Sequence, residues 1–168
     1  VGDGRPSAET VEGVETRYET VTSEEQLTRV IEEMREAGYF AFDTETTHID
    51  PKQATDPMKA DLVGLSFATT PGKAWYVPVG HSEGRQLPLE QVLAQVKPVM
   101  ESPQNSKVAH NCTFALTLLE ELGIKTQRMD FDTMVAAQMS GKKTIGLKEL
   151  VLDVLGVEMT RISELLGT

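Results

Sequence analysis

The hydrophobic residues of the chain recur at two spacings, and turn residues separate the segments. In residues 27–34 the apolar positions fall at i, i+3, i+4 and i+7, a stripe that predicts an amphipathic helix. Ser23 and Gln26 have the spacing of a capping box just before this stripe, and Gly38 stands where a helix commonly ends. The pattern therefore predicts a helix that begins after Ser23 and stops at Gly38.

Shorter runs rich in β-branched and aromatic residues predict strands. Pro71-Gly72 lies between two such runs, which indicates a hairpin. A polar loop is expected over 46–60, soon after the strand that ends at Asp43. The predicted strands are 17–21, 39–43, 62–68, 74–79 and 107–110, with a short extended piece at 129–131.

Further apolar stripes predict helices between and after the later strands. Pro98 lies inside the first of them and is expected to kink or restart it. A three-stranded meander followed by strand–helix–strand units predicts an α/β domain with a mixed β-sheet flanked by helices, a pattern compatible with the ribonuclease-H-like fold. The predicted helices are 87–101, 112–122, 132–139 and 147–155.

Length and composition fit one domain, because the chain has 168 residues of ordinary polarity. We interpret residues 1–16 as a polar linker, which suggests a preceding segment, and residues 17–168 as the domain. No apolar run approaches the roughly 18 residues that span a bilayer, and the first residues lack the features of a signal peptide. We therefore expect a cytoplasmic protein with no membrane partner. The single cysteine, Cys112, excludes an internal disulfide.

The net charge of −10 narrows the classes of function. A free-standing protein that binds nucleic acid without sequence preference is normally basic, because it neutralises phosphates. A domain this acidic is expected to hold DNA weakly by itself, unless metal ions or a neighbouring basic domain supply positive charge.

The candidate chemistry lies in Asp43-Thr44-Glu45, where the predicted buried strand runs out into the loop. Residues two apart on a strand point to the same face, so both carboxylates can meet one site. Adjacent carboxylates repel each other unless a cation neutralises them, and hard oxygen ligands suit Mg²⁺ or Mn²⁺. The spacing alone also allows a simpler interpretation, in which Asp43 caps the loop and Glu45 is only solvated.

The residues around this pair resemble the DEDD exonucleases, in the form found in family A DNA polymerases. Residues 40–46 (FAFDTET) resemble the first exonuclease motif, and residues 107–111 (KVAHN) resemble the beginning of the second. The resemblance runs from about residue 17 to residue 167. Its other ordered segments are LVGLSFA (62–68), PG (71–72), YVPV (76–79), LGI (122–124), FDTM (131–134), GLKEL (146–150) and ISELLG (162–167).

The resemblance implies the 3′→5′ proofreading exonuclease domain of a DNA polymerase I-type enzyme. Such a domain removes mispaired nucleotides from a single-stranded or frayed DNA 3′ end with two divalent ions, Mg²⁺ or Mn²⁺. Asp43 and Glu45 match catalytic metal ligands of the family. Thr46 and Ile49 fall where the family contacts the 3′ end, and Asn111 matches the asparagine that opens the second motif. The implied partner is a polymerase domain in the same polypeptide.

Two departures from the family pattern predict an impaired exonuclease. The second motif is normally Asn-x-x-x-Asp, but Ala115 occupies the aspartate position, and a methyl group cannot bind a metal. The third motif, a tyrosine or histidine followed by an aspartate, is expected beyond Gly167, where this sequence stops. Deliberate substitution and natural loss both explain Ala115, and an aspartate at position 115 of the parent sequence would identify the former.

Two other functions stay open from the sequence. Ala115 and the acidic charge favour a non-catalytic domain that braces a polymerase domain. A ribonuclease-D-like enzyme that acts on RNA is less favoured, because residues 62–79 resemble the polymerases. Among the remaining polar residues, we interpret His110 as a packing or hydrogen-bonding residue, Asp132 as a helix cap and Cys112 as an unreactive thiol.

Overall fold

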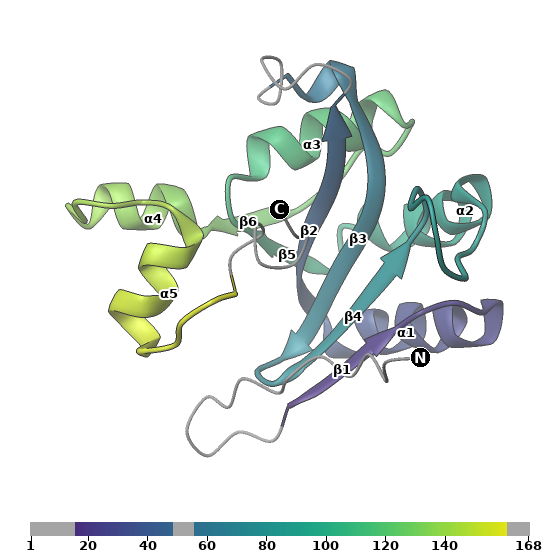
Figure 1. Ribbon diagram of the computed structural model, residues 1–168, viewed down its shortest axis with the longest axis horizontal. Helices are drawn as coiled ribbons and strands as arrows, with labels where there is room; N and C mark the ends of the chain where they lie inside the picture. Colours follow the sequence, from purple (N-terminus) through teal and green to yellow (C-terminus); the bar gives the residue numbers. More distant parts are fainter. Residues whose placement is uncertain (1–15, 49–55, 161–168) are drawn as a thin grey trace.

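The computed structural model describes residues 16–48 and 56–160 and shows a mixed six-stranded sheet with helices packed against it (Figure 1). The strand order is β1-β4-β3-β2-β5-β6. None of the described helices is both long and apolar enough to cross a membrane. The elements are β1 (Arg17–Thr20), α1 (Glu24–Ala37), β2 (Tyr39–His48), the 3-10 helix η2 (Pro57–Lys59), β3 (Ala60–Thr70), β4 (Lys73–Pro78), α2 (Leu89–Met100), β5 (Ser106–Ala109), α3 (Cys112–Glu121), β6 (Met129–Asp132), α4 (Thr133–Met139) and α5 (Leu147–Leu155).

The centre of the sheet is the predicted meander. Strands β2, β3 and β4 are antiparallel neighbours, and the β3–β4 hairpin turns at Pro71-Gly72, where Gly72 has a positive φ of 79°. Strands β5 and β6 extend the sheet from β2 in parallel, each after a helical crossover. The predicted mixed α/β sheet is therefore confirmed. The pairing of β1 in parallel with the outer edge of β4 was not anticipated.

One face of the sheet is buried, and the other carries polar and small residues. Strand β2 alternates regularly, since Phe40 and Phe42 are buried while Asp43 and Glu45 are exposed. Phe40 packs edge-on against Phe67 of β3, with ring centroids 6.1 Å apart. Helices α1, α2 and α3 contribute to the same core. The candidate carboxylates therefore project from the face opposite the main core.

The predicted start of α1 is confirmed in detail. The Ser23 hydroxyl oxygen accepts from the Gln26 N–H at 3.3 Å, and the Gln26 side-chain oxygen accepts from the Ser23 N–H at 3.0 Å. Gly38 ends the helix with φ 71°, in the left-handed region. Because these signals act within one turn of chain, the local sequence was sufficient to predict them.

Two predicted boundaries were wrong. Strand β2 does not end near Asp43 but continues to His48, because Thr46 and Thr47 still pair with β3 after a bulge at Glu45/Thr46. The region predicted as loop therefore begins with strand residues and contains η2 at its end. Helix α2 begins at Leu89 and runs without a break through Pro98, so the proline does not restart it.

Lys107 of β5 is a buried cation at the end of the sheet remote from Asp43. Its side chain is 0% exposed, its Nζ donates to the Ser102 carbonyl oxygen at 2.7 Å, and it lies 5.8 Å from the Phe40 ring centroid. Desolvation, aided by the nearby positive charge of Arg128 and opposed by Asp130, lowers the pKa of Lys107 to about 8. The charged form is thus less favourable in the folded protein than in the unfolded chain.

This lowered pKa predicts a stability that increases with pH. Because the folded protein releases the Lys107 proton from about pH 8 upwards while the unfolded chain holds it to about pH 10, we expect the unfolding free energy to rise across that window by up to about 3 kcal/mol. Chemical denaturation at pH 7 and pH 10 of the parent and of Lys107→Met measures this, and the variant should lack the rise. Equal pH dependence of the two proteins would contradict the assignment.

Candidate active site

Asp43 and Glu45 stand two residues apart on the open face of β2, with regular alternation between them because the bulge follows Glu45. Asp43 lies opposite Ser66 of β3, and Glu45 lies opposite Gly64. The predicted sharing of one face is therefore confirmed. The pair sits within a paired strand, however, and not where a strand runs out into a loop, so Asp43 is not a loop cap.

Both carboxyl groups have raised pKa values, chiefly because they are partly desolvated. Desolvation raises the pKa of Asp43, although the Thr44 N–H donates to its Oδ1 at 2.9 Å and His110 also favours the charged form. Desolvation likewise raises the pKa of Glu45, and the charge of Asp43 raises it further, while His81 lowers it. A cation placed between the two carboxylates would relieve this repulsion.

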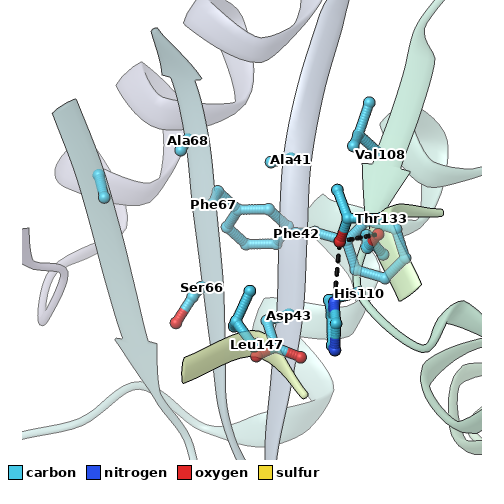
Figure 2. Close-up of a pocket in the computed structure, with 12 residues that line it drawn as sticks. Ala41, Phe42, Asp43, Ser66, Phe67, Ala68, Val108, His110, Thr133 and Leu147 are labelled. Atoms are coloured by element: carbon cyan, nitrogen blue, oxygen red, sulfur yellow. Dashed lines mark hydrogen bonds between the residues drawn. The ribbon is translucent and has the colours of Figure 1, made fainter. Parts of the chain in front are cut away.

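An apolar groove of about 280 Å³ opens beside Asp43 (Figure 2). Small side chains from three strands form its floor, and Leu147 from the first turn of α5 lies over it. The polar residues on its lining are Asp43, Ser66, His110 and Thr133. The small floor residues are Ala41 of β2, Ala68 of β3 and Ala74 of β4.

His110 is held at one side of the groove next to Asp43 (Figure 2). Its Nδ1 lies 2.9 Å from the Thr133 hydroxyl oxygen, which agrees with the predicted hydrogen-bonding role. Its Nε2 is inaccessible to solvent and has no hydrogen-bond partner among the described residues. A buried nitrogen of this kind usually has a partner, so His110 Nε2 is an unsatisfied polar atom.

Asp132 brings the second motif and α4 together at the same edge of the sheet. One carboxylate oxygen accepts from the Asn111 N–H at 3.2 Å and the Met134 N–H at 2.8 Å, and the other accepts from the Cys112 N–H at 2.7 Å. The Val135 N–H also donates to the first of these oxygens, at 3.3 Å. The predicted cap of α4 is confirmed, and the same carboxylate also caps α3.

The remaining predicted residues are only partly placed. Asn111 precedes α3 with φ 59°, and its side chain makes no capping hydrogen bond. Thr46 follows the bulge and is half-buried opposite Leu62. Ile49 lies outside the described residues. Ala115 lies in α3, is 4% exposed and belongs to the hydrophobic core. As an alanine it brings no carboxylate to this position.

Asp43 and Glu45 can bind a divalent cation, but they supply only some of its ligands. Among residues 16–48 and 56–160, no group of three or more His, Cys, Asp or Glu side chains is arranged to hold a metal ion. Mg²⁺ is commonly bound through one or two carboxylates while it keeps several waters. Asp43 and Glu45 therefore fit one partly hydrated ion but do not form a closed metal cage.

Two residues near Glu45 received no role from the sequence. Tyr76 lies on β4, and its hydroxyl oxygen is 2.6 Å from His81 Nε2. Desolvation and, after it, the charge of Glu45 raise the pKa of Tyr76. Tyr76 belongs to a segment that the family resemblance covers, but its approach to Glu45 depends on strand register. The sequence held no local signal for it.

Comparison with known proteins gives one matching family, described as 3′-5′ exonuclease, over residues 18–165. The chain is 39% identical to DNA polymerase I of Chloroflexus aurantiacus over 143 residues, which are 84% of this chain and 14% of that protein. It is 32% identical to DNA polymerase I of Pseudomonas aeruginosa over 167 residues, which are 95% of this chain and 18% of that protein. The chain thus spans less than a fifth of these relatives.

The fold is also similar to that of solved exonucleases. Escherichia coli RNase D, an exoribonuclease involved in structured RNA processing, superposes with a TM-score of 0.65 at 16% identity, over 89% of this chain and 36% of that chain. At this identity the similarity supports the ribonuclease-H-like fold and carries no information on substrate.

Proposed function

The chain belongs to the family of 3′-5′ exonuclease domains of family A DNA polymerases, and from this we propose that it is a proofreading domain whose own cleavage activity is severely impaired. The observation that supports the proposal is that Asp43 and Glu45 share one open face of β2, while Ala115, which the family resemblance matches to a further carboxylate, is a buried alanine. The expected substrate is a single-stranded or frayed DNA 3′ end, and the expected partner is a polymerase domain of the same polypeptide.

Asp43 and Glu45 would hold a divalent cation, Mg²⁺ or Mn²⁺. Such an ion, when bound, lowers the pKa of a coordinated water and stabilises charge on a leaving oxygen. Both side chains project from a central strand, because β2 pairs with β5 over its first residues and with β3 through Asp43 and Glu45. Thr46 and Ile49 are proposed to contact the 3′ end, with Asn111 at the start of the second motif.

Impairment follows from the number of carboxylates. Two metal ions about 4 Å apart need shared acidic ligands, and Asp43 with Glu45 supplies two carboxylates where the family pattern has more. A loss of several kcal/mol in transition-state stabilisation reduces the rate by orders of magnitude, since about 1.4 kcal/mol is a factor of ten. We therefore propose weak binding of one ion and very slow cleavage.

A non-catalytic bracing domain is the second candidate, and a surface feature favours it. Helices α4 and α5 project from the β6 edge of the sheet (Figure 1), and several of their apolar side chains face solvent. Apolar surface of this kind is typical of a contact with another protein surface. The exposed apolar residues are Val135 and Met139 of α4 and Leu152, Val154 and Leu155 of α5.

Removal of Asp43 tests the metal site directly. Asp43→Ala leaves one carboxylate, so we expect Mn²⁺ affinity to fall more than about tenfold, because one unit charge at contact distance contributes a few kcal/mol. Calorimetric titration of Mn²⁺ into the parent and the variant measures this. The control is Asp153→Ala, which removes an exposed carboxylate of α5 that pairs with Lys142. No Mn²⁺ binding by the parent, or equal binding by parent and Asp43→Ala, would reject the proposed site.

A further inference from the structure

Tyr76 and His81 form a hydrogen-bonded pair on the same face of the sheet as the candidate carboxylates. The Tyr76 hydroxyl oxygen lies 2.6 Å from His81 Nε2. The two rings also meet edge-on, with centroids 5.7 Å apart and an interplanar angle of 78°. The phenol is therefore held at its ring and at its hydroxyl.

Strand register places this phenol beside Glu45. Tyr76 lies opposite Ser66, which in turn lies opposite Asp43, so these three side chains form one row across the sheet. Glu45 and Gly64 belong to the next row. Cross-strand partners and their diagonal neighbours on one face are within reach of a long aromatic side chain.

Gly64 shows how closely the phenol approaches that row. A side-chain carbon at position 64 would overlap the Tyr76 hydroxyl oxygen and the adjacent ring carbons. The Tyr76 hydroxyl thus occupies the space where the cross-strand partner of Glu45 would otherwise have its side chain. This requires glycine at position 64 for packing, since nothing in its φ demands one.

The loop that carries His81 is fixed to the sheet. The His81 N–H donates to the Gln86 side-chain oxygen at 3.0 Å, and the Gln86 amide donates back to the His81 carbonyl oxygen at 2.8 Å. The Gly80 N–H donates to the Val63 carbonyl oxygen at 3.0 Å. Because the loop is bonded to β3 at Gly80 and closed on itself between His81 and Gln86, His81 is a defined partner for Tyr76.

Glu45 influences the pKa of Tyr76, and His81 influences the pKa of Glu45. Desolvation and then the negative charge of Glu45 raise the pKa of Tyr76. His81 acts on Glu45 in turn and favours its charged form. These effects agree with the geometry, which puts the hydroxyl over Gly64, the cross-strand partner of Glu45.

We propose that Tyr76, held by His81, is a positioning residue that orients the Glu45 carboxylate for cation binding. When His81 Nε2 carries its proton and donates to the phenol oxygen, the Tyr76 hydroxyl proton is free to donate to a Glu45 oxygen. That bond restricts the rotamers of a glutamate that otherwise faces solvent. The inference rests on the proposed metal site and assigns two residues to its support.

The first test measures Mn²⁺ affinity in single and double variants. Tyr76→Phe keeps the ring and removes only the hydroxyl, and we expect about a tenfold loss, the lower end of what partners of metal ligands contribute. His81→Gln should weaken binding in the same direction. The double variant should be no weaker than Tyr76→Phe alone, because His81 acts through Tyr76. Tyr39→Phe, an exposed tyrosine of β2, is the control and should bind like the parent.

The second test needs no metal. Nuclear magnetic resonance of the His81 ring should show shifted signals in Glu45→Gln and unchanged signals in Glu36→Gln, an exposed glutamate of α1. Unchanged Mn²⁺ affinity in Tyr76→Phe, together with unmoved His81 signals in Glu45→Gln, would overturn the proposal. If the parent binds no Mn²⁺, the proposed function fails, and the His81 signals alone decide whether the pair contacts Glu45.

Discussion

Replacement of Asp132 by alanine is expected to lower the unfolding free energy by about 2–4 kcal/mol. The carboxylate accepts hydrogen bonds from the first N–H groups of two helices, Cys112 at α3 and Met134 and Val135 at α4. Loss of one N-cap costs about 1 kcal/mol, and hydrogen bonds to a charged group contribute more than neutral ones. Chemical denaturation at pH 7 measures the change.

The stabilisation that Asp132 provides should depend on pH. Desolvation pushes the pKa of Asp132 upwards, but the hydrogen bonds from Cys112, Met134 and Val135 outweigh it and lower the pKa to about 2, from an ordinary value near 3.8. A lowered pKa in the folded state means that the stability is present above about pH 4 and is lost as the pH falls towards 2. The parent and Asp132→Ala should therefore converge in stability at low pH.

A single-bond cap provides the matched control. Asp56 caps η2 through one hydrogen bond, from the Met58 N–H at 3.1 Å. Asp56→Ala should cost about 1 kcal/mol or less. If Asp132→Ala costs no more than Asp56→Ala, the bridge between the two helices does not stabilise the fold.

The parts of the fold that the sequence predicted well are those fixed by nearby residues. The capping box of Ser23 and Gln26, the helix end at Gly38 and the Pro71-Gly72 turn all act within a few residues. The alternation that puts Asp43 and Glu45 on one face is equally local. These features need no knowledge of what packs against them.

The parts that were missed depend on residues far apart in the chain. Strand β1 joins β4 across more than fifty residues, and no local pattern distinguishes that edge from any other. Strand β2 continues past Glu45 because β3 offers hydrogen bonds to Thr46 and Thr47, although their side chains are polar. Threonine is itself common in strands, so this pairing agrees with the local preference of the two residues, and the prediction of a loop gave too much weight to their polarity.

In the candidate site, too, some residues could be predicted from nearby sequence and others only from the tertiary structure. Family motifs identified the carboxylates, because those residues are adjacent in sequence. The second role of Asp132 appeared only in the structure, where the pairing of β5 with β6 brings the start of α3 next to the start of α4. The contact of Tyr76 with the Glu45 row depends on the register of three strands and on the missing side chain at Gly64. Supporting residues of this kind are determined by tertiary structure alone.

Replacement of Ala115 by aspartate is expected to have opposite effects without and with a divalent cation. Ala115 is 4% exposed in the core, and an ionised carboxylate buried without a partner is strongly destabilising. In the absence of metal we expect the unfolding free energy to fall by about 2–4 kcal/mol. If the new carboxylate joins Asp43 and Glu45, Mn²⁺ should restore most of that loss, because a ligand that binds only the folded state stabilises it.

Denaturation with and without Mn²⁺ should separate a restored metal ligand from a damaged core. Ala115→Asn carries the same shape without the charge, so it should be destabilised with little recovery in Mn²⁺. Ala115→Asp combined with Asp43→Ala should also fail to recover, because the shared site is then incomplete. Digestion of a 3′-labelled single-stranded DNA should follow the same order, with Ala115→Asp faster than the parent. If Mn²⁺ restores neither stability nor cleavage to Ala115→Asp, position 115 does not face the carboxylate site, and the alanine at this position does not account for the proposed impairment of cleavage.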